Sequence, residues 1–355
     1  MTNCPLYVNQ IKLLSKNQLV IVCSTMYSSP NFNGKVFVNS IPTKSGVDGN
    51  KWALITEGLK KHLNTKPAKP PGPFPVNYNK INNLPADALR ITWLGHSGLI
   101  IEIDGKRFLT DPVYRAASPL QFIGPKRFFP APIPLGKMPH LDGIIISHDH
   151  YDHLDHKTVV ELAKKGIPFY TSLGVGPILQ KWGIPKEQIT EFDWWQELDL
   201  GNGFKITAAP ARHFSGRSLF NRNQTFWASY AIKGPVHNVY YGADSGMHPL
   251  FAEIAEKLGP FDISMLEVGA ANELWADIHM GPDKATDAQL ALKSTLMMPI
   301  HWGTFNLAFH TWTYPAERVI ECAQEKNIGL LLPAPGETYT FDGRSYVNKW
   351  WQPFM

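Results

Sequence analysis

Cysteine is scarce in this chain, which has three cysteines in 355 residues: Cys4, Cys23 and Cys322. Their odd number and wide spacing exclude a disulfide framework as the basis of the fold, and no Cys-x-x-Cys motif is present. Cys322 lies in a segment that we expect to be helical, so we predict that it is a buried apolar residue.

Long apolar runs and concentrated charge are also missing. No run approaches the roughly 18 apolar residues of a transmembrane helix, so the sequence predicts none. The net charge of +4 is small and spread along the chain, which is too little to indicate a nucleic-acid partner. Because this charge is compatible with an anionic membrane surface, we expect a peripheral membrane or cytoplasmic protein.

The N-terminus contains one short apolar run, residues 19–23, which follows Lys12 and Lys16. The pattern is similar to a truncated bacterial lipoprotein signal, in which Cys23 would carry the lipid. The run is short, however, and Val22 is larger than the small residue expected before such a cysteine. The sequence therefore favours a peripheral or disordered N-terminus over lipoprotein anchoring through Cys23.

The chain divides into three predicted parts. Residues 66–75 are rich in proline, which cannot join a helix or a central strand, so they predict an extended arm that wraps or links. We expect an N-terminal extension over residues 1–83 that contains this arm, a catalytic domain over residues 84–345 and a C-terminal tail over residues 346–355. A hydrophobic content of 44% is enough for a sizeable core.

Short apolar elements fill the chain from about residue 88 onward. We expect strands at residues 91–94, 99–103, 108–110, 143–147, 168–171, 204–208, 226–232, 239–241, 263–268, 297–300 and 330–332, and helices at residues 52–63, 158–165, 251–258, 282–293 and 316–325. Asp104 and Gly105 form a typical hairpin turn. Strands in meander order, followed by alternating strands and helices, predict an α/β fold of sheets covered by helices.

The most informative segment is residues 148–153, which read His-Asp-His-Tyr-Asp-His directly after the apolar run 143–147. A buried strand that ends in this cluster brings imidazoles and a carboxylate to one point, and these groups suit zinc and other borderline divalent ions. The alternative is a histidine-rich solvated loop. The preceding strand and the distant partners described next argue against it.

Four predicted strands share one pattern, in which a residue able to bind metal follows the strand end. Segments 144–147, 206–209, 239–241 and 298–300 lead to His148, His213, Asp244 and His301. The complete candidate set is His148, His150, Asp152, His153, His213, Asp244 and His301. Seven ligands are too many for one tetrahedral zinc ion, which takes four, but they suit two ions that share a bridging ligand.

This pattern resembles the metallo-β-lactamase superfamily, whose signature is His-x-His-x-Asp-His followed by a distant His, Asp and His. The resemblance implies a four-layer αββα sandwich with two zinc ions at one sheet edge. It implies a first metal held by His148, His150 and His213. It implies a second metal held by Asp152, His153 and His301. Asp244 would bridge the two ions together with a hydroxide.

A narrower resemblance, over roughly residues 84–339, is to N-acyl-phosphatidylethanolamine-hydrolysing phospholipase D. The similar motifs are Trp93-Leu94-Gly95-His96, Leu109-Thr110-Asp111-Pro112, residues 146–155, Gly259-Pro260-Phe261-Asp262 and residues 300–305. This family implies a zinc-dependent phosphodiesterase that acts on a phospholipid at a membrane surface, releasing phosphatidic acid and an N-acylethanolamine. It implies that a metal-bridging hydroxide is the nucleophile, and it favours a homodimer.

Three other functions are compatible with a metal site of this kind. A lactonase or other carboxylic-ester hydrolase would keep the metals and change the bond that is cleaved. A nucleic-acid phosphodiesterase is disfavoured because the chain has no concentrated basic stripe. A non-catalytic lipid-binding protein is disfavoured because a structural zinc needs only four ligands.

The predicted catalytic residues are Asp152, Asp244 and His279. Asp152 is expected to help orient the hydroxide, and Asp244 to bridge the metals. His279 is expected to bind phosphate or protonate the leaving oxygen; the alternative is a surface histidine before a helix. His96 is interpreted as a structural histidine in preference to a site residue, and Asp111 is expected to orient ligand histidines through hydrogen bonds.

Substrate contacts are predicted more loosely. The loop 121–129 interleaves aromatic and basic residues, so its aromatic side chains could enter a bilayer interface while Lys126 and Arg127 meet lipid phosphates. The alternative is that these aromatic residues, Phe122, Phe128 and Phe129, pack on the domain. The arginines around His213 could clamp a phosphate or be solvated; they are Arg212, Arg217 and Arg222.

Overall fold

The computed structural model describes residues 8–13, 19–24, 27–45, 51–218 and 220–355. The first elements are a hairpin of β1 (Val8–Leu13) and β2 (Leu19–Ser24), followed by α1 (Lys51–Leu59) and α2 (Tyr78–Asn82). Cys4 and the side chain of Cys23 lie outside the described part, so the structure does not test lipid attachment. Among the described residues, no helix combines the length and apolar character needed to cross a membrane.

One sheet has seven strands in the order β16-β3-β4-β5-β6-β7-β8. Their bounds are β3 (Leu89–Gly95), β4 (Gly98–Ile103), β5 (Lys106–Thr110), β6 (Gly143–Ile146), β7 (Phe169–Ser172), β8 (Ile189–Phe192) and β16 (Thr338–Thr340). The strands from β16 to β5 pair antiparallel, and those from β5 to β8 pair parallel. The turn between β4 and β5 is made by Asp104 and Gly105, both at positive φ, as a tight hairpin requires.

The second sheet has six strands in the order β14-β13-β12-β11-β10-β9. Their bounds are β9 (Glu197–Gly201), β10 (Phe204–Ala209), β11 (Ser229–Lys233), β12 (Asn238–Tyr241), β13 (Ile263–Glu267) and β14 (Leu296–Ile300). The pairs from β9 to β12 are antiparallel, whereas β12, β13 and β14 run parallel. The carboxyl ends of these parallel strands therefore meet at one edge of the sheet.

The two-residue period of the strands divides the core into two layers. In β4, Leu99, Ile101 and Ile103 belong to the large apolar cluster shared with the second sheet. Ile100 belongs instead to the cluster on the outer face of the first sheet. Because successive side chains point to opposite faces, a strand buried on both sides is apolar at nearly every position.

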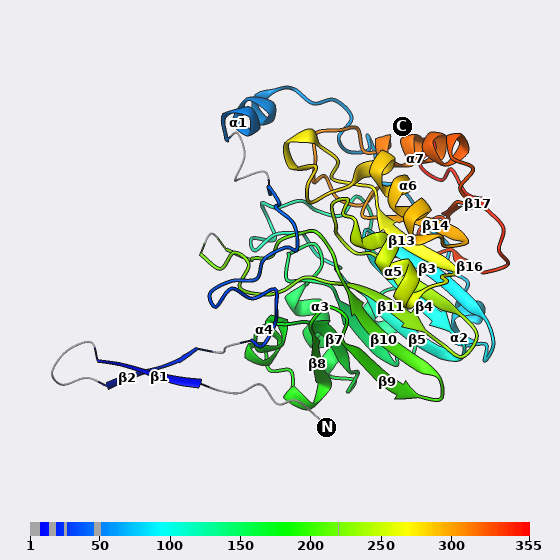
Figure 1. The fold of residues 1–355 in the computed structure, drawn as a ribbon. Helices are drawn as coiled ribbons and strands as arrows, with labels where there is room; N and C mark the ends of the chain where they lie inside the picture. The colour runs from blue at the N-terminus through cyan, green and yellow to red at the C-terminus, as the bar shows by residue number, and fades with distance from the viewer. Residues whose placement is uncertain (1–7, 14–18, 25–26, 46–50, 219) are drawn as a thin grey trace.

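Helices cover both outer faces (Figure 1). Helices α3 (His156–Ala163) and α4 (Val175–Lys181) pack on the seven-stranded sheet. Helices α5 (Leu250–Leu258), α6 (Gly281–Leu292) and α7 (Tyr314–Glu325) lie on the six-stranded sheet. This four-layer arrangement confirms the predicted αββα sandwich.

The segments outside the predicted catalytic domain also contribute to packing. Phe37 is fully buried and stacks on Phe226, with ring centroids 4.8 Å apart. At the other end, β17 (Tyr346–Val347) pairs with β15 (Leu331–Leu332). Trp351 is fully buried and meets Trp302 edge-on at 5.3 Å. The buried Trp351 therefore anchors the C-terminal segment to the core of the domain.

Some local predictions needed correction. The strand predicted at residues 226–232 begins at Ser229, because the backbone before it bonds the ends of strands in the first sheet: Phe226 N donates to Leu173 O after β7, and Ala228 N donates to Ser147 O after β6. Strands β8 and β9, helix α4 and the N-terminal hairpin were not predicted. Cys322 lies in α7 and is buried, as predicted.

Candidate metal centre

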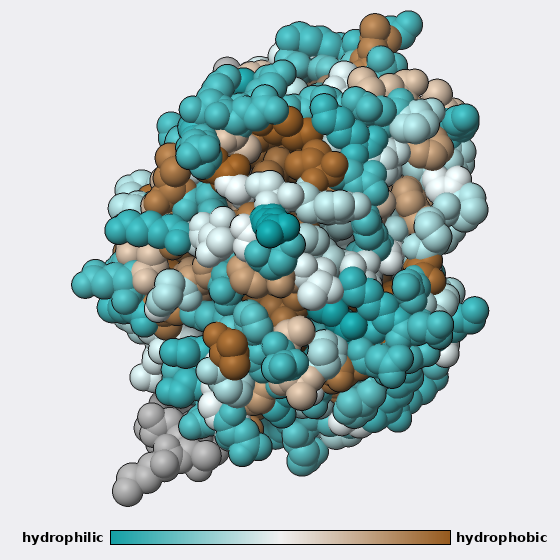
Figure 2. Space-filling model, turned by 90° about the vertical axis from the view of Figure 1, so that its right-hand side faces the viewer, coloured by the Kyte–Doolittle hydropathy of each residue, from teal (hydrophilic) through white to brown (hydrophobic). Residues whose placement is uncertain are grey.

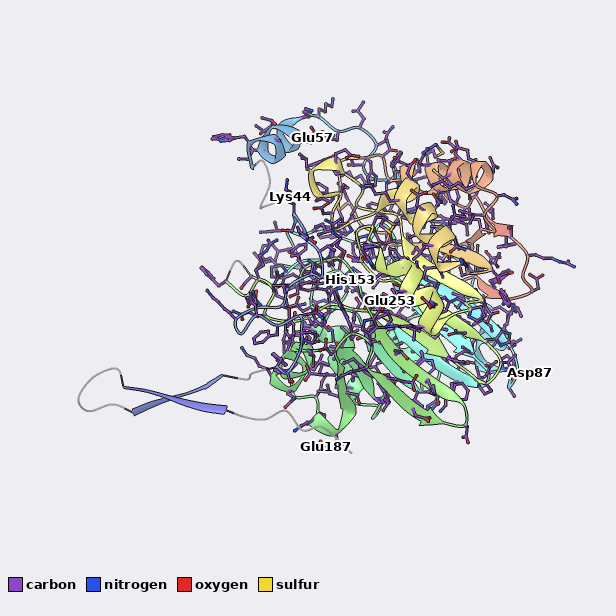
Figure 3. The ribbon with its side chains drawn as sticks, viewed as in Figure 1. Lys44, Glu57, Asp87, His153, Glu187 and Glu253 are labelled. Atoms are coloured by element: carbon purple, nitrogen blue, oxygen red, sulfur yellow. The ribbon has the colours of Figure 1, made fainter. Side chains whose placement is uncertain are left out.

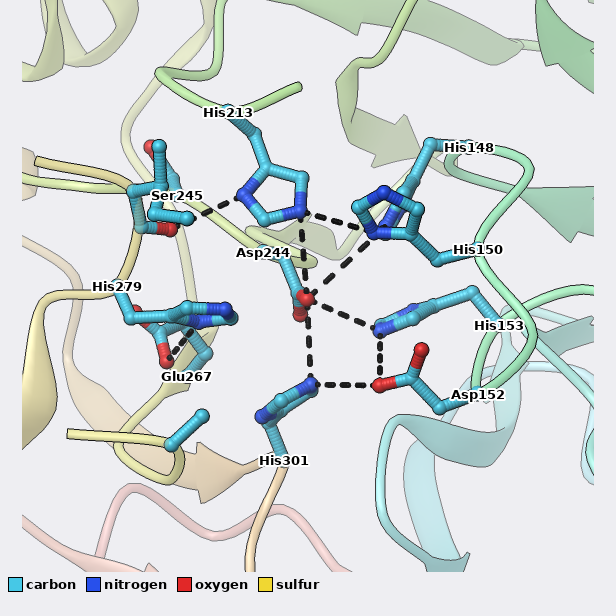
Figure 4. Close-up of polar contacts among 12 residues, drawn as sticks. His148, His150, Asp152, His153, His213, Asp244, Ser245, Glu267, His279 and His301 are labelled. Carbon is cyan, nitrogen blue, oxygen red and sulfur yellow. Dashed lines mark hydrogen bonds and ion pairs between the residues drawn. The ribbon is translucent and has the colours of Figure 1, made fainter. Parts of the chain in front are cut away.

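The seven side chains proposed from the sequence come together in the structure. Residues 148–153 follow β6, His213 follows β10, Asp244 follows β12 and His301 follows β14. Figure 3 shows His153 inside the molecule, whereas the labelled Asp87 and Glu187 lie at its periphery. The ends of strands from both sheets thus position the site, and Figure 4 shows the side chains pointing toward one another.

A first cluster consists of three buried or half-buried imidazoles (Figure 4). His148 Nε2 lies 2.9 Å from His150 Nδ1, and His213 Nε2 lies 3.2 Å from the same atom. Burial lowers the pKa of all three histidines, and their mutual repulsion adds to this effect for His148 and His213. The three rings are therefore neutral and meet at one point.

A second cluster surrounds the carboxylate of Asp152. Its Oδ2 lies 3.2 Å from His301 Nε2 and 3.5 Å from His153 Nε2. The same oxygen lies 3.1 Å from His96 Nε2. His96 therefore both faces the site and is hydrogen-bonded. In the prediction from the sequence these two roles are alternatives, but the structure combines them.

Asp244 lies between the two clusters. Its Oδ2 is 3.1 Å from both His153 Nε2 and His301 Nε2. It is also 3.7 Å from His213 Nε2 and 4.0 Å from His148 Nε2. One carboxylate oxygen thus reaches histidines of both clusters, which is the place that the sequence predicted for a bridging residue.

Outer hydrogen bonds fix which ring nitrogens face inward. His213 Nδ1 lies 3.0 Å from the Ile278 carbonyl oxygen, and His153 Nδ1 lies 2.7 Å from Asp111 Oδ2. Because a carbonyl or carboxylate can only accept, each Nδ1 donates outward and each Nε2 faces the centre. Burial lowers the pKa of His153, but Asp244, Asp152 and Asp111 outweigh burial and hold that pKa well above its ordinary value, so a bound cation would take the place of its Nε2 proton. These inward-facing ring nitrogens and two carboxylates form a donor set that suits borderline divalent cations.

The electrostatic balance of the second cluster also favours a cation. Burial disfavours the charged form of His301, but Asp244 and Asp152 outweigh burial and raise its pKa to about 10. Asp244 Oδ1 is buried and has no hydrogen-bond partner among the described residues. The residues present thus fit the divalent metal that the donor set indicates.

Asp111 supports the site from below. Its Oδ2 accepts hydrogen bonds from Ser147 Oγ at 2.5 Å and Tyr241 OH at 2.5 Å, in addition to the one from His153. Its Oδ1 accepts from the Ser147 backbone N–H at 2.8 Å. Asp111 is fully buried. Its hydrogen bonds connect Ser147, after β6 of the first sheet, and Tyr241, in β12 of the second sheet, to the candidate ligand His153.

His279 lies across the centre from Asp152 (Figure 4). Its ring centroid is 5.2 Å from that of His213 and 5.3 Å from that of His301, so it faces both clusters. Its Nδ1 lies 3.3 Å from Glu267 Oε2. The sequence-based alternative of a surface histidine does not match this position.

Glu267 was not recognised from the sequence. It is fully buried at the end of β13, and burial raises its pKa. Its Oε1 accepts a hydrogen bond from the Met280 backbone N–H, so the carboxylate holds both the His279 ring and the loop around it. The available signal was an acidic residue inside an otherwise apolar strand.

A second missed residue is Asn39, from the N-terminal extension. Its Nδ2 donates to the His213 carbonyl oxygen at 2.7 Å, and its Oδ1 accepts from the His213 N–H at 3.1 Å. A glycine at position 269 is also needed to let the His301 backbone approach, because a Cβ there would lie 1.8 Å from the His301 carbonyl oxygen. No local pattern in the sequence points to Asn39, which acts across 174 positions.

The basic and aromatic residues predicted to contact the substrate have different positions in the structure. Arg127 donates to the carbonyl oxygens of Val113 and Phe129 and is a structural tie, not a lipid contact. Phe129 is buried, whereas the Phe122 side chain is 73% exposed. Arg212 donates to the backbone of residues 42 and 247 and to Thr43 Oγ1, so it holds the extension against the site.

The fold and the site define a metal-dependent hydrolase. The chain matches the model of the Beta-lactamase superfamily domain over residues 106–302 and belongs to that family. It is 41% identical over 331 residues to an uncharacterized protein of Mycobacterium tuberculosis, covering 91% of this chain and 88% of the relative. The family membership agrees with the resemblance seen in the sequence.

Two further comparisons refine this placement. The chain is 32% identical over 297 residues to N-acyl-phosphatidylethanolamine-hydrolyzing phospholipase D 1 of Caenorhabditis elegans, covering 79% of this chain and 83% of the relative. The structure of a metallo hydrolase from Ignicoccus hospitalis superimposes with a TM-score of 0.55 at 20% identity, covering 72% of this chain and 99% of that one. The first places the chain near N-acyl-phosphatidylethanolamine-hydrolysing phospholipases, and the second shows the shared fold.

Proposed function

We propose that this protein is a dinuclear zinc phosphodiesterase that cleaves N-acyl-phosphatidylethanolamine-type phospholipids into phosphatidic acid and N-acylethanolamine. The observation that carries the proposal is the pair of ligand clusters that share Asp244, with His279 facing both. The Caenorhabditis elegans relative, whose name states this activity, supports the choice of substrate.

The proposed ligands divide as the two clusters do. His148, His150 and His213 would hold one ion, and Asp152, His153 and His301 the other, with Asp244 between them. Two divalent ions held by these residues would supply a nucleophile at neutral pH by lowering the pKa of water, and they would offset charge on the phosphate oxygens.

The protein groups have separate tasks in this reaction. Asp152 is placed to accept a hydrogen bond from the attacking water and so to orient it. His279 Nδ1 lies beside Glu267, so in the doubly protonated ring Nε2–H can donate to the phosphate or give its proton to the leaving alkoxide oxygen. The buried Glu267 carboxylate would stabilise that imidazolium. The water would form its bond to phosphorus and pass a proton to Asp152 while the bond to the ethanolamine oxygen breaks, and the N-acylethanolamine would leave with the proton from His279.

The decisive experiment combines metal analysis with a substrate panel. We expect two zinc ions per chain, one for each cluster. We expect release of phosphatidic acid from N-acyl-phosphatidylethanolamine, loss of this activity after chelation and recovery on addition of zinc. Hydrolysis of lactones without any cleavage of phosphodiesters would replace the proposal with a carboxylic-ester hydrolase. Light scattering of the same sample tests the proposed homodimer.

Replacing His279 with alanine tests the leaving-group role. We expect kcat on N-acyl-phosphatidylethanolamine to fall about 10²–10⁴-fold, the usual contribution of a general acid, with unchanged zinc content. The loss should be much smaller with a p-nitrophenyl phosphodiester, because p-nitrophenolate needs no proton to leave. The matched control is His140→Ala, since His140 is exposed. Parental kcat at parental zinc content would exclude the role.

A further inference from the structure

A cavity of about 300 Å³ lies beside the candidate ligand loop. Its wall includes Tyr151, which stands between His150 and Asp152 in the sequence, and Trp182 at the end of α4. The loop after β5 and the loop after β10 supply one arginine each, Arg115 and Arg217. The cavity is separate from the metal centre, because none of the seven candidate ligands lines it.

The arginines give this cavity a positive charge. The Arg217 guanidinium lies 3.9 Å from the ring centroid of Tyr151 and 5.3 Å from that of Trp182. Arg115 is half-buried, and its guanidinium makes no hydrogen bond or ion pair with the part of the chain that the structure describes. Arg217 Nη1 donates to the carbonyl oxygens of Asp149 and Leu154 at 2.6 and 2.9 Å, which leaves its other nitrogens for a ligand. Arg115, which has no such partner, is therefore the main candidate to bind a phosphate group, with Arg217 beside it.

The carboxylate in the wall offsets part of this charge, because Asp155 and the nearby Asp149 both interact favourably with the Arg217 guanidinium. Asp155 is buried, and its Oδ2 accepts from Thr158 Oγ1 at 2.6 Å and from the Tyr114 N–H at 3.3 Å. Those bonds hold the carboxylate at the start of α3. His156, also in the wall, stacks against Trp182 and adds no negative charge.

The loop that forms one side of the cavity also presents an apolar tip. Leu120, Phe122 and Ile123 are 50%, 73% and 71% exposed. Gln121 fixes the loop beneath them, since its Nε2 donates to the Ser118 carbonyl oxygen at 2.8 Å and its Oε1 accepts from the Ala116 N–H at 3.0 Å. A contiguous exposed apolar tip on a braced loop marks an interaction site, and a membrane interface suits such a tip.

The position of this loop agrees with that interpretation. In Figure 1 the loops after β5 and β10 lie on the left of the molecule, on the side where the ligand-bearing strand ends point. The face shown in Figure 2 belongs to the right of Figure 1 and is mostly hydrophilic, with one larger brown area in its upper part and smaller ones elsewhere.

We propose that the cavity and the apolar tip form a docking site for an anionic phospholipid at a bilayer surface. Leu120, Phe122 and Ile123 enter the acyl boundary, while Arg115 and Arg217 hold the lipid phosphate. This docking site is additional to the metal centre. It rests on the proposed function in one respect, which is that the protein acts at a bilayer surface. The adjacent apolar tip and paired arginines favour a lipid over a soluble phosphate.

Vesicle co-sedimentation without substrate tests this site. The zinc-loaded protein should bind vesicles of phosphatidylcholine with phosphatidylglycerol more tightly than vesicles of phosphatidylcholine alone. Arg115→Glu should weaken binding to the anionic vesicles at least about tenfold, because two units of charge change at the surface. The matched control, Arg344→Glu, changes an exposed arginine outside the cavity and should have little effect. Equal losses in both variants would show unspecific attraction and overturn the cavity.

The apolar tip has its own variant and control. Replacing Leu120, Phe122 and Ile123 by serine should reduce binding to both kinds of vesicle, whereas Val236→Ser, at a 71% exposed valine, should not. Unchanged melting temperatures verify folding. Unchanged turnover of a water-soluble phosphodiester verifies the metal centre, so a failure of docking is distinct from a failure of the proposed reaction.

A third experiment tests whether the cavity binds inorganic phosphate. Calorimetric titration should show weak phosphate binding that Arg115→Glu removes, together with the preference for anionic vesicles. Phosphate binding that depends on Arg115 without any preference among vesicles would assign the cavity to a soluble phosphate compound and overturn the lipid proposal.

Discussion

Replacing Asp244 with asparagine is expected to lower kcat by about 10²–10³-fold, the loss typical when a preorganised charged group is removed from an active site. Its Oδ2 is the carboxylate oxygen that lies 3.1 Å from His153 and His301 and still within 4.0 Å of His148. An amide of the same shape preserves packing but removes the negative charge. Two cations that share this position would then repel each other with less compensation.

The measurement for this variant is kcat together with zinc content per chain. Asp199→Asn is the control, because Asp199 is exposed on the edge strand β9 and its carboxylate accepts a hydrogen bond from the nearby Gly201 N–H. We expect normal zinc and normal kcat in the control. If Asp244→Asn kept parental kcat at parental zinc content, Asp244 would not bridge the two sites.

Replacing Asp111 with alanine is expected to weaken both the metal centre and the fold. The change removes the buried acceptor shared by Ser147 Oγ, His153 Nδ1 and Tyr241 OH. Tyr241 keeps the Ser97 carbonyl oxygen at 3.2 Å and Ser147 keeps His148 Nδ1 at 2.8 Å, so His153 loses the most. Unsatisfied buried donors are costly, so we expect the free energy of unfolding to fall by about 2–5 kcal/mol. Loss of an outer partner of a ligand histidine should reduce zinc affinity about 10–100-fold.

Urea denaturation and competition with a zinc chelator measure these two effects. Asp111→Asn should fall between the parent and Asp111→Ala, since one acceptor oxygen remains while an amide N–H₂ faces the donors. Asp142→Ala, which removes the carboxylate that accepts from the Arg107 N–H at 2.8 Å, is the control for loss of a carboxylate outside the site. Unchanged zinc affinity in Asp111→Ala would show that His153 does not depend on this bond.

The candidate ligands could be predicted because each follows an apolar strand. Carboxyl ends of parallel strands meet at one sheet edge, so sheet geometry brings together Asp244 after β12 and His301 after β14. His148 follows β6 of the other sheet and reaches them because the two sheets pack face to face. Glu267 follows the same logic, but it was read as part of a buried strand. Asn39 could not be found, because its contact with His213 spans 174 positions and has no local pattern.

The missed elements have physical causes as well. Strand β9 alternates exposed and half-buried positions at the sheet edge, so it lacks the apolar run that identified the central strands. Helix α4 contains Gly176 and Pro177 in its first turn, which is typical of a loop in sequence even though proline is tolerated there. In the loop 121–129 the alternation of residue types could not reveal that Phe129 is buried and Phe122 exposed.

The hydrogen bonds between Asn39 and the His213 backbone limit how far the chain can be shortened without affecting the metal centre. Asn39 lies upstream of every strand of the two large sheets, yet it bonds the backbone on both sides of a candidate ligand. A shortened enzyme that starts at residue 84 would retain all seven donors and still lack the brace for one of them. A transfer of this centre to another scaffold would therefore have to include the segment that contains Asn39.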